Sequence, residues 1–77
     1  MNERLLKILA SVFEIKEVNI SLELKKDDID SWDSLKQMDL VVSLEEGYGI
    51  VLEMEEIVKM NSVQSIVDIL SIKGILQ

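Results

Sequence analysis

An acidic turn leads into the start of an amphipathic segment in the stretch Asp30-Ser31-Trp32-Asp33-Ser34-Leu35-Lys36-Gln37-Met38-Asp39-Leu40. Asp33 suits the N-cap of a helix that begins at Ser34, because its carboxylate can accept from the unpaired backbone N–H groups that follow. Polar residues then recur at helical spacing along one stripe, opposite apolar ones. The stripe contains Lys36, Asp39, Ser43 and Glu46, and the opposite side contains Val41, Leu44 and Tyr48. We therefore predict a helix from Ser34 to about Tyr48, with Gly47 or Gly49 as its left-handed cap.

Ser34 has two interpretations at the start of this helix. A helix start gathers free N–H donors and the positive end of the dipole, so an anion attached to the Ser34 hydroxyl would be favourably placed. Alternatively, Ser34 and Gln37 have the spacing of a capping box, in which Ser34 would be only the cap.

The chain from Asp33 to Ile69 resembles an acyl carrier protein, and three motifs carry the resemblance in register without a gap. They are the attachment-like triplet Asp33-Ser34-Leu35, the segment Leu44-Glu45-Glu46-Gly47-Tyr48-Gly49-Ile50, and Ser62-Val63-Gln64-Ser65-Ile66-Val67-Asp68, which is similar to the start of the family's last helix. The resemblance implies that Ser34 carries 4′-phosphopantetheine, whose terminal thiol holds an acyl group as a thioester.

The expected fold is all-α: a four-helix acyl-carrier-like bundle with a long first loop and a short third helix, formed by residues 1–77 as a single domain. A first helix over residues 3–14 has apolar residues at helical spacing and Asn2 as its cap. The third helix is expected over Met54 to Met60, with Met54, Ile57, Val58 and Met60 as its apolar side. The last helix begins at a cap on Asn61 or Ser62, buries Val63, Ile66, Val67, Ile69 and Leu70, and ends near Gly74. Met38, Leu44, Ile57 and Ile66 are expected in the core, and the resemblance implies that such residues part to shelter an acyl chain.

Residues 15–33 are less regular, because Val18, Ile20, Leu22 and Leu24 alternate with polar residues as in a strand. A strand here could pair only with the short Ile50–Leu52 segment, and such a pair would be poorly stabilised. The resemblance implies a long loop instead, so we interpret Ile20, Leu22, Leu24 and Ile29 as anchors that attach it to the helices. Trp32, the one tryptophan, is interpreted as a half-buried anchor of this loop, with a surface contact for a partner enzyme as the alternative.

The chain contains no cysteine and no histidine. Disulfides, Ser-His and Cys-His nucleophile pairs and His- or Cys-based zinc sites are therefore excluded. Carboxylates on a solvated face lack the pocket that would shift their pKa for acid–base work, so we predict no catalytic residue, no metal site and no enzyme activity. No apolar run approaches the roughly 18 residues that span a bilayer, and a cytoplasmic protein is expected.

The net charge of −7 is concentrated in the middle of the chain. Residues 27–59 contain ten Asp/Glu and two Lys/Arg, whereas residues 1–26 contain four and five. Such a field repels nucleic acid and anionic membrane and steers basic partner surfaces, although acidic residues also keep small domains in solution.

The predicted partner surface comprises Asp33, Leu35, Lys36, Asp39, Val42, Glu45, Glu46, Glu55 and Glu56. The resemblance implies three kinds of partner: a phosphopantetheinyl transferase, an acyl- or aminoacyl-loading enzyme, and an acyl-using synthase or transferase. The chain is expected to be a monomer.

Three residues depart from the family's usual pattern. Trp32 stands where a small residue is common in fatty-acid carriers, Lys36 interrupts the acidic stripe, and Glu53 stands where proline is frequent. The Trp-Asp-Ser-Leu form resembles free-standing carriers of specialised pathways. Two alternatives stay open: an aminoacyl or peptidyl carrier that is loaded by an adenylating enzyme, and a non-carrier acidic helical adapter in which Ser34 is only a cap.

Overall fold

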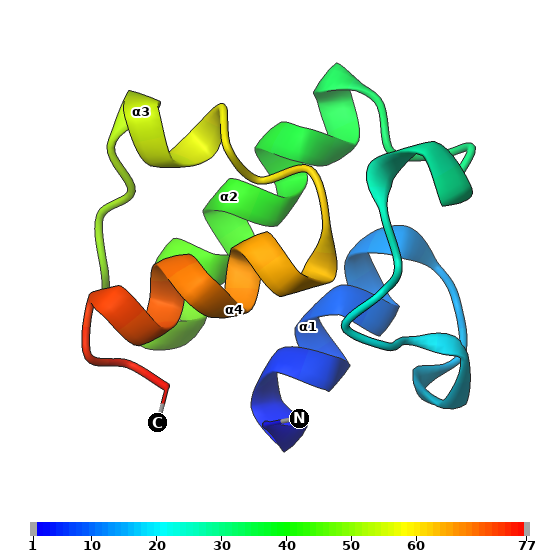
Figure 1. Cartoon of the computed structure of the whole chain (residues 1–77), viewed down its shortest axis with the longest axis horizontal. Coiled ribbons are helices and arrows are strands. Elements are labelled where there is room, and N and C mark those ends of the chain that lie inside the picture. Colours follow the sequence, from blue (N-terminus) through cyan, green and yellow to red (C-terminus); the bar gives the residue numbers. More distant parts are fainter. Residues whose placement is uncertain (1, 77) are drawn as a thin grey trace.

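The computed structural model describes residues 2–76 and contains four α-helices. They are α1 (Glu3–Phe13), α2 (Ser34–Tyr48), α3 (Met54–Ile57) and α4 (Val63–Ile72). Two short 3₁₀ turns, Glu17–Asn19 and Lys26–Asp28, lie in the loop between α1 and α2 (Figure 1). The described residues form no strand, so the predicted all-α bundle with a long first loop is confirmed and the strand alternative for residues 18–24 is wrong.

α1 begins where the sequence predicts, because the Asn2 side chain accepts a hydrogen bond from Leu5 N at 3.1 Å. The helix buries Leu5, Leu9, Val12 and Phe13 against the other helices. It ends at Glu14, which adopts a left-handed conformation with φ 56° and donates its backbone N–H to the Ala10 carbonyl. A left-handed non-glycine residue costs roughly 1–2 kcal/mol, so the turn after α1 is held by its surroundings.

The long loop is attached to the bundle through both side chains and backbone. Ile20 and Ile29 are buried and Leu24 is half-buried, as predicted. Leu22 is 42% exposed, so its predicted role as an apolar anchor is wrong. The loop uses backbone atoms at that point: the carbonyls of Leu22 and Leu24 accept from Gln64 N and Val63 N at 3.2 and 2.9 Å. These bonds satisfy N–H groups that every helix start leaves free, and they join the loop to α4.

Gly49, and not Gly47, is the left-handed residue that ends α2, with φ 64°. Its N–H donates to the Glu45 carbonyl. Gly47 lies within the helix, where an added Cβ would come 2.8 Å from Ile8 Cδ1 of α1. The two glycines therefore have different roles. Gly49 ends α2 in a left-handed conformation, and Gly47 lets α1 and α2 approach closely.

α3 is shorter than predicted, with four residues instead of seven. Met60 is buried and Ile57 is half-buried, but Met54 and Val58 are 71% and 69% exposed, so their predicted inward position is wrong. A helix of one turn has only one narrow side to bury, and Ile57 already occupies it.

α4 closes the core. Ser62 is its cap, accepting from Ser65 N at 3.0 Å, and Gly74, with φ 80°, follows its end as predicted. The helix buries Val63, Ile66, Ile69 and Leu70, while Val67 is half-buried.

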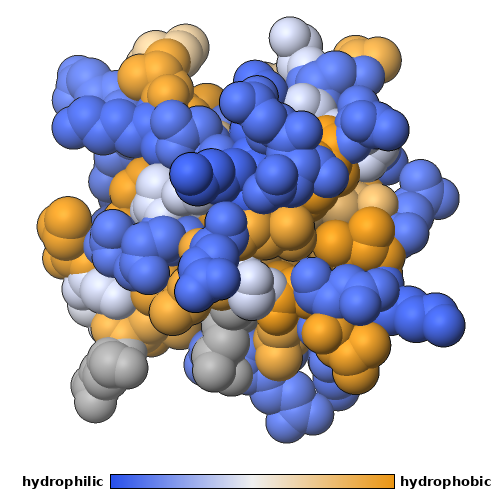
Figure 2. Space-filling model, turned by 45° about the vertical axis from the view of Figure 1, so that its right-hand side comes forward, coloured by the Kyte–Doolittle hydropathy of each residue, from blue (hydrophilic) through white to orange (hydrophobic). Residues whose placement is uncertain are grey.

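Hydrophobic residues also reach the surface among hydrophilic ones, as the face in Figure 2 shows. No helix in residues 2–76 has the length and apolar character needed to cross a membrane.

Candidate functional site

Ser34 is the first residue of α2, and Asp33 is its N-cap. The Asp33 carboxylate accepts from Lys36 N at 2.9 Å, and the Asp33 carbonyl accepts from Gln37 N at 2.9 Å. The predicted cap is thus confirmed, and the capping box between Ser34 and Gln37 is wrong. The backbone N–H of Gln37, which a Ser34 capping box would have needed, donates to the Asp33 carbonyl instead.

The Ser34 side chain is exposed, and its hydroxyl makes no hydrogen bond to any residue from 2 to 76. It lies at the N-terminus of the longest of the four helices, where the dipole favours an attached anion. A phosphodiester on this oxygen would therefore meet neither a competing hydrogen bond nor an unfavourable end of the helix. The residues present fit the attachment of a phosphate-linked group.

Trp32 anchors the turn that precedes Ser34. Its side chain is 3% exposed, and its ring lies 4.5 Å from that of Phe13 between centroids. Its indole Nε1 donates to Gln37 Oε1 at 2.6 Å. The anchor interpretation is confirmed, with deeper burial than expected, and the alternative of a surface contact for a partner is wrong.

Gln37 links this turn to α3. Its Nε2 donates to the carbonyls of Ile57 and Met60, at 3.0 and 3.2 Å. From the sequence, Gln37 is interpreted only as part of a capping box, and its link to α3 is not predicted. Its signal was weak, because the partners lie 20 and 23 positions away along the chain.

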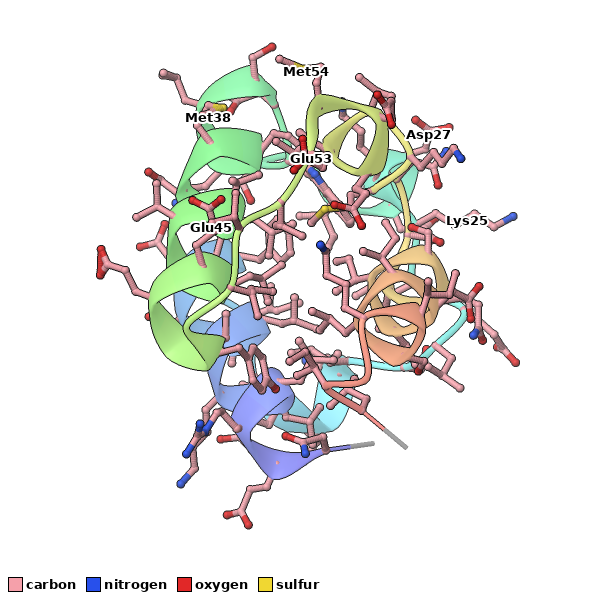
Figure 3. The ribbon with its side chains drawn as sticks, turned by 90° about the vertical axis from the view of Figure 1, so that its left-hand side faces the viewer. Lys25, Asp27, Met38, Glu45, Glu53 and Met54 are labelled. Carbon is pink, nitrogen blue, oxygen red and sulfur yellow. The ribbon has the colours of Figure 1, made fainter. Side chains whose placement is uncertain are left out.

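An apolar stripe runs along the exposed side of α2 from the turn that holds Ser34. Leu35, Met38 and Val42 are all exposed, with Met38 at 54%, so the predicted core position of Met38 is wrong. Their spacing of three and four residues places them on one face of the helix, a signal that was already present in the sequence. Figure 3 shows Met38 at the same end of the molecule as Met54 of α3.

The acidic residues of the predicted partner surface differ in their surroundings. Asp33, Asp39, Glu46 and Glu55 are exposed. Glu45 is half-buried, and its carboxylate accepts from Leu52 N at 2.9 Å, so it braces the link after α2 (Figure 3). A charge held in this way is less available to a partner than the exposed four.

Glu56 is also engaged within the protein. Its carboxylate accepts from Glu53 N at 2.8 Å and pairs with Lys73 Nζ at 3.1 Å. The hydrogen bond from the Glu53 backbone, followed by the Lys73 interactions, holds the pKa of Glu56 below its ordinary value. Glu56 therefore joins α3 to the end of α4.

Lys36 is paired with a carboxylate at the end of α1. Its Nζ lies 3.5 Å from Glu14 Oε2, at the end of α1. The side chain of Lys36 is 24% exposed and that of Glu14 is 78% exposed, so the pair is partly screened by solvent. The pairing reduces the interruption that Lys36 makes in the acidic surface beside Ser34.

Comparison with known proteins agrees with this geometry. A family model described as "Phosphopantetheine attachment site" matches residues 3–70. An acyl carrier protein of Petrotoga mobilis (strain DSM 10674 / SJ95) is 32% identical over 72 residues, which cover 92% of this chain and 84% of the relative. The family model covers α1, α2, α3 and α4 up to residue 70, and it supports a carrier role. The chain belongs to the acyl carrier protein family, in which 4′-phosphopantetheine is the covalently attached cofactor.

Proposed function

We propose that Ser34 is the residue that carries 4′-phosphopantetheine, and that the chain holds acyl groups as thioesters on that arm and presents them to partner enzymes. The single observation that carries the proposal is the exposed, unbonded Ser34 hydroxyl at the start of α2. When bound, the cofactor supplies a thiol at the end of a flexible arm. Residues 1–77 are proposed to act as a single carrier domain, to which the arm gives a high effective concentration of cargo at each partner.

The chain's own residues hold and present the attachment point. Asp33 caps the helix, Trp32 fixes the preceding turn in the core, and the first turn of α2 offers the Ser34 oxygen to solvent. No residue of the chain is proposed to perform chemistry on the cargo. The partner enzymes supply the catalytic groups.

The proposed partner surface surrounds Ser34. Leu35 and Val42, together with Met38, supply the apolar centre, while Asp33, Asp39, Glu46 and Glu55 supply exposed negative charge. Charge around an apolar centre sets the association rate and orientation, and the centre supplies most of the affinity. A phosphopantetheinyl transferase, a loading enzyme and an acyl-using synthase or transferase are the proposed occupants. Glu45, Glu56 and Lys36, which are engaged within the protein, are proposed to contribute less.

The first experiment is an intact-mass measurement after incubation with coenzyme A and a broad-specificity phosphopantetheinyl transferase. We expect the chain to gain one phosphopantetheine unit and Ser34→Ala to gain none. Ser31→Ala, on the turn before α2, is the matched control and should gain the unit as the native chain does. No gain in the native chain under conditions that modify a known carrier would leave Ser34 as an ordinary helix residue on an acidic adapter.

A second measurement separates the two classes of cargo. The modified protein is incubated either with an acyl-loading enzyme and its acyl donor or with an adenylating enzyme, ATP and an amino acid. Acylation in the first reaction alone supports the proposal. Loading only in the second would assign the chain to aminoacyl carriers.

A further inference from the structure

α3 depends on the rest of the molecule for its stability. It has four residues, far below the roughly 12–15 at which an isolated helix becomes even marginally stable. Its own Met54 and the following Val58 are exposed and contribute little burial. The contacts that keep α3 in place are therefore few: the Ile57 and Met60 side chains, the pair between Glu56 and Lys73, and the hydrogen bonds from Gln37.

Gln37 is the side chain that joins α3 to the attachment turn. Its amide oxygen accepts from Trp32 Nε1 at 2.6 Å, and its amide nitrogen donates to both Ile57 O at 3.0 Å and Met60 O at 3.2 Å. An amide can accept and donate twice at the same time, a combination that a carboxylate, a hydroxyl or an ammonium group cannot supply here. Both donor hydrogens of this side chain are used.

The position of Gln37 relative to Ser34 gives these bonds a consequence for function. Trp32 lies two residues before Ser34 and Gln37 lies three residues after it. The Ser34 turn is therefore fixed on both sides by a network whose far end is α3. Undocking of α3 from α2 removes both hydrogen bonds that Gln37 donates. The Trp32 indole then donates to a Gln37 side chain that nothing else holds in place.

We propose that Gln37 is a positioning residue for Ser34, which makes presentation of the Ser34 hydroxyl to the transferase depend on the docking of α3. This inference rests on the proposed function of Ser34 as the attachment residue. When α3 is undocked, only a fraction of the molecules holds the turn in the competent position. The apparent affinity for the transferase is then reduced to that fraction of its full value, so the effect appears as a higher KM.

The test compares Gln37→Leu with Gln37→His and with Ile66→Val. Leucine has a similar length but can neither accept nor donate, whereas a neutral imidazole can accept from Trp32 and donate to one carbonyl. Ile66 is a buried residue of α4 that takes no part in the hydrogen bonds of Gln37, and its shortening to valine lowers stability by about 0.5–1.5 kcal/mol. It controls for loss of stability alone.

Two readouts are measured on each purified protein, at a temperature well below every melting point. The first is the KM and kcat of modification by a phosphopantetheinyl transferase with coenzyme A. The second is the indole N–H signal in a ¹H–¹⁵N NMR spectrum, which is unambiguous because the chain has one tryptophan. The NMR readout needs no enzyme and no cofactor.

Gln37→Leu is expected to raise KM about fivefold or more, the factor that the net loss of one or two hydrogen bonds produces, with kcat little changed. Its indole signal should shift and exchange faster with solvent. Gln37→His should recover most of the KM, and Ile66→Val should keep both the KM and the indole signal of the native chain.

Native KM in Gln37→Leu would overturn the positioning role, as would an equal rise of KM in Ile66→Val. An unmodified native chain is a different result, because it would remove the proposed function of Ser34 itself. In that case the indole signal would still show whether Gln37 joins the turn to α3.

Discussion

The rings of Phe13 and Trp32 lie with their centroids 4.5 Å apart and their planes tilted by 37°, which joins the last turn of α1 to the turn before Ser34. Both side chains are 3% exposed. Two contacts of Trp32 thus hold the turn before Ser34: the ring contact with Phe13 and the hydrogen bond to Gln37. Trp32 is therefore a structural support of the candidate site.

Trp32→Ala should lower the free energy of unfolding by about 3–5 kcal/mol, because it removes a large buried side chain and leaves a cavity. Trp32→Phe should cost less, since the ring contact with Phe13 is kept and mainly one hydrogen bond is lost. Urea unfolding followed by circular dichroism measures both without tryptophan fluorescence. Equal losses in the two variants would mean that the ring contact contributes nothing.

Asp33→Ala should destabilise the protein by about 1 kcal/mol, the usual cost of losing an N-cap side chain. Asp33→Asn keeps an oxygen that can accept from Lys36 N and should retain most of the stability. The midpoint of urea unfolding, at an unchanged slope, reports the difference. A stable Asp33→Ala would show that the observed bond at 2.9 Å contributes little.

The two glycines near the end of α2 should respond differently to alanine. Gly49→Ala places a Cβ on a residue with φ 64° and should cost about 1–2 kcal/mol. Gly47→Ala should be close to neutral, because the gain in helix propensity, about 1 kcal/mol, offsets the adjustment of the flexible Ile8 end. Thermal unfolding of both variants checks this, and a larger loss in Gly47→Ala would mean that Ile8 cannot turn away.

Glu56 should make the stability of the protein depend on pH below its ordinary pKa of 4.5. Because the hydrogen bond from Glu53 N and the pair with Lys73 lower its pKa in the folded state, the charged form favours folding. This contribution is fully present above 4.5 and is lost as the pH falls through the lower folded pKa. Glu56→Gln should therefore be less stable than the native chain at pH 7, and the difference should shrink at pH 3.

The control for this titration is Glu55→Gln, on the exposed neighbouring residue. At pH 7 it should cost less stability in urea unfolding than Glu56→Gln, because the Glu55 side chain is exposed. A Glu56→Gln difference that stays constant over this range would contradict the lowered pKa.

Lys36→Glu should lower the KM of a phosphopantetheinyl transferase with a basic surface by a few-fold at low salt, because it extends the acidic field beside Ser34. The advantage should diminish as salt rises toward 0.15 M and above, where exposed charges are screened beyond about 8 Å. Lys7→Glu makes the same change of charge on α1 and should have a smaller effect. Equal effects would mean that net charge, and not its place on the surface, decides association.

Much of the bundle could be predicted because the signals are local. Asn2, Asp33 and Ser62 each cap a helix through a backbone N–H three residues ahead, and such bonds depend only on neighbouring residues. The apolar periods of α1 and α4 likewise identify their buried faces. The place of Ser34 at the start of α2 follows from the same local chemistry.

The errors lie where the sequence period and the tertiary packing disagree. Met38 and Met54 are apolar residues of predicted helices, yet they are 54% and 71% exposed. The residues that α2 buries are Leu40, Val41 and Leu44. Leu22 contributes a carbonyl to α4 instead of a side chain to the core. An apolar residue in a pattern shows that burial is favourable, but only the packed structure determines which side chains are covered.

The sequence by itself determined the helical class, the cap at Asp33, the position of Ser34 and the concentration of acidic residues around it, because these depend on composition and on contacts within one helical turn. Only the tertiary structure decided that Gln37 joins Trp32 to α3, that Glu45 and Glu56 are engaged within the protein, and that Met38 belongs to the surface stripe. The physical reason is distance along the chain. Gln37 donates to carbonyls 20 and 23 positions away, and the ion pairs of Lys36 and Glu56 join different helical segments. Such partners meet only when the helices pack.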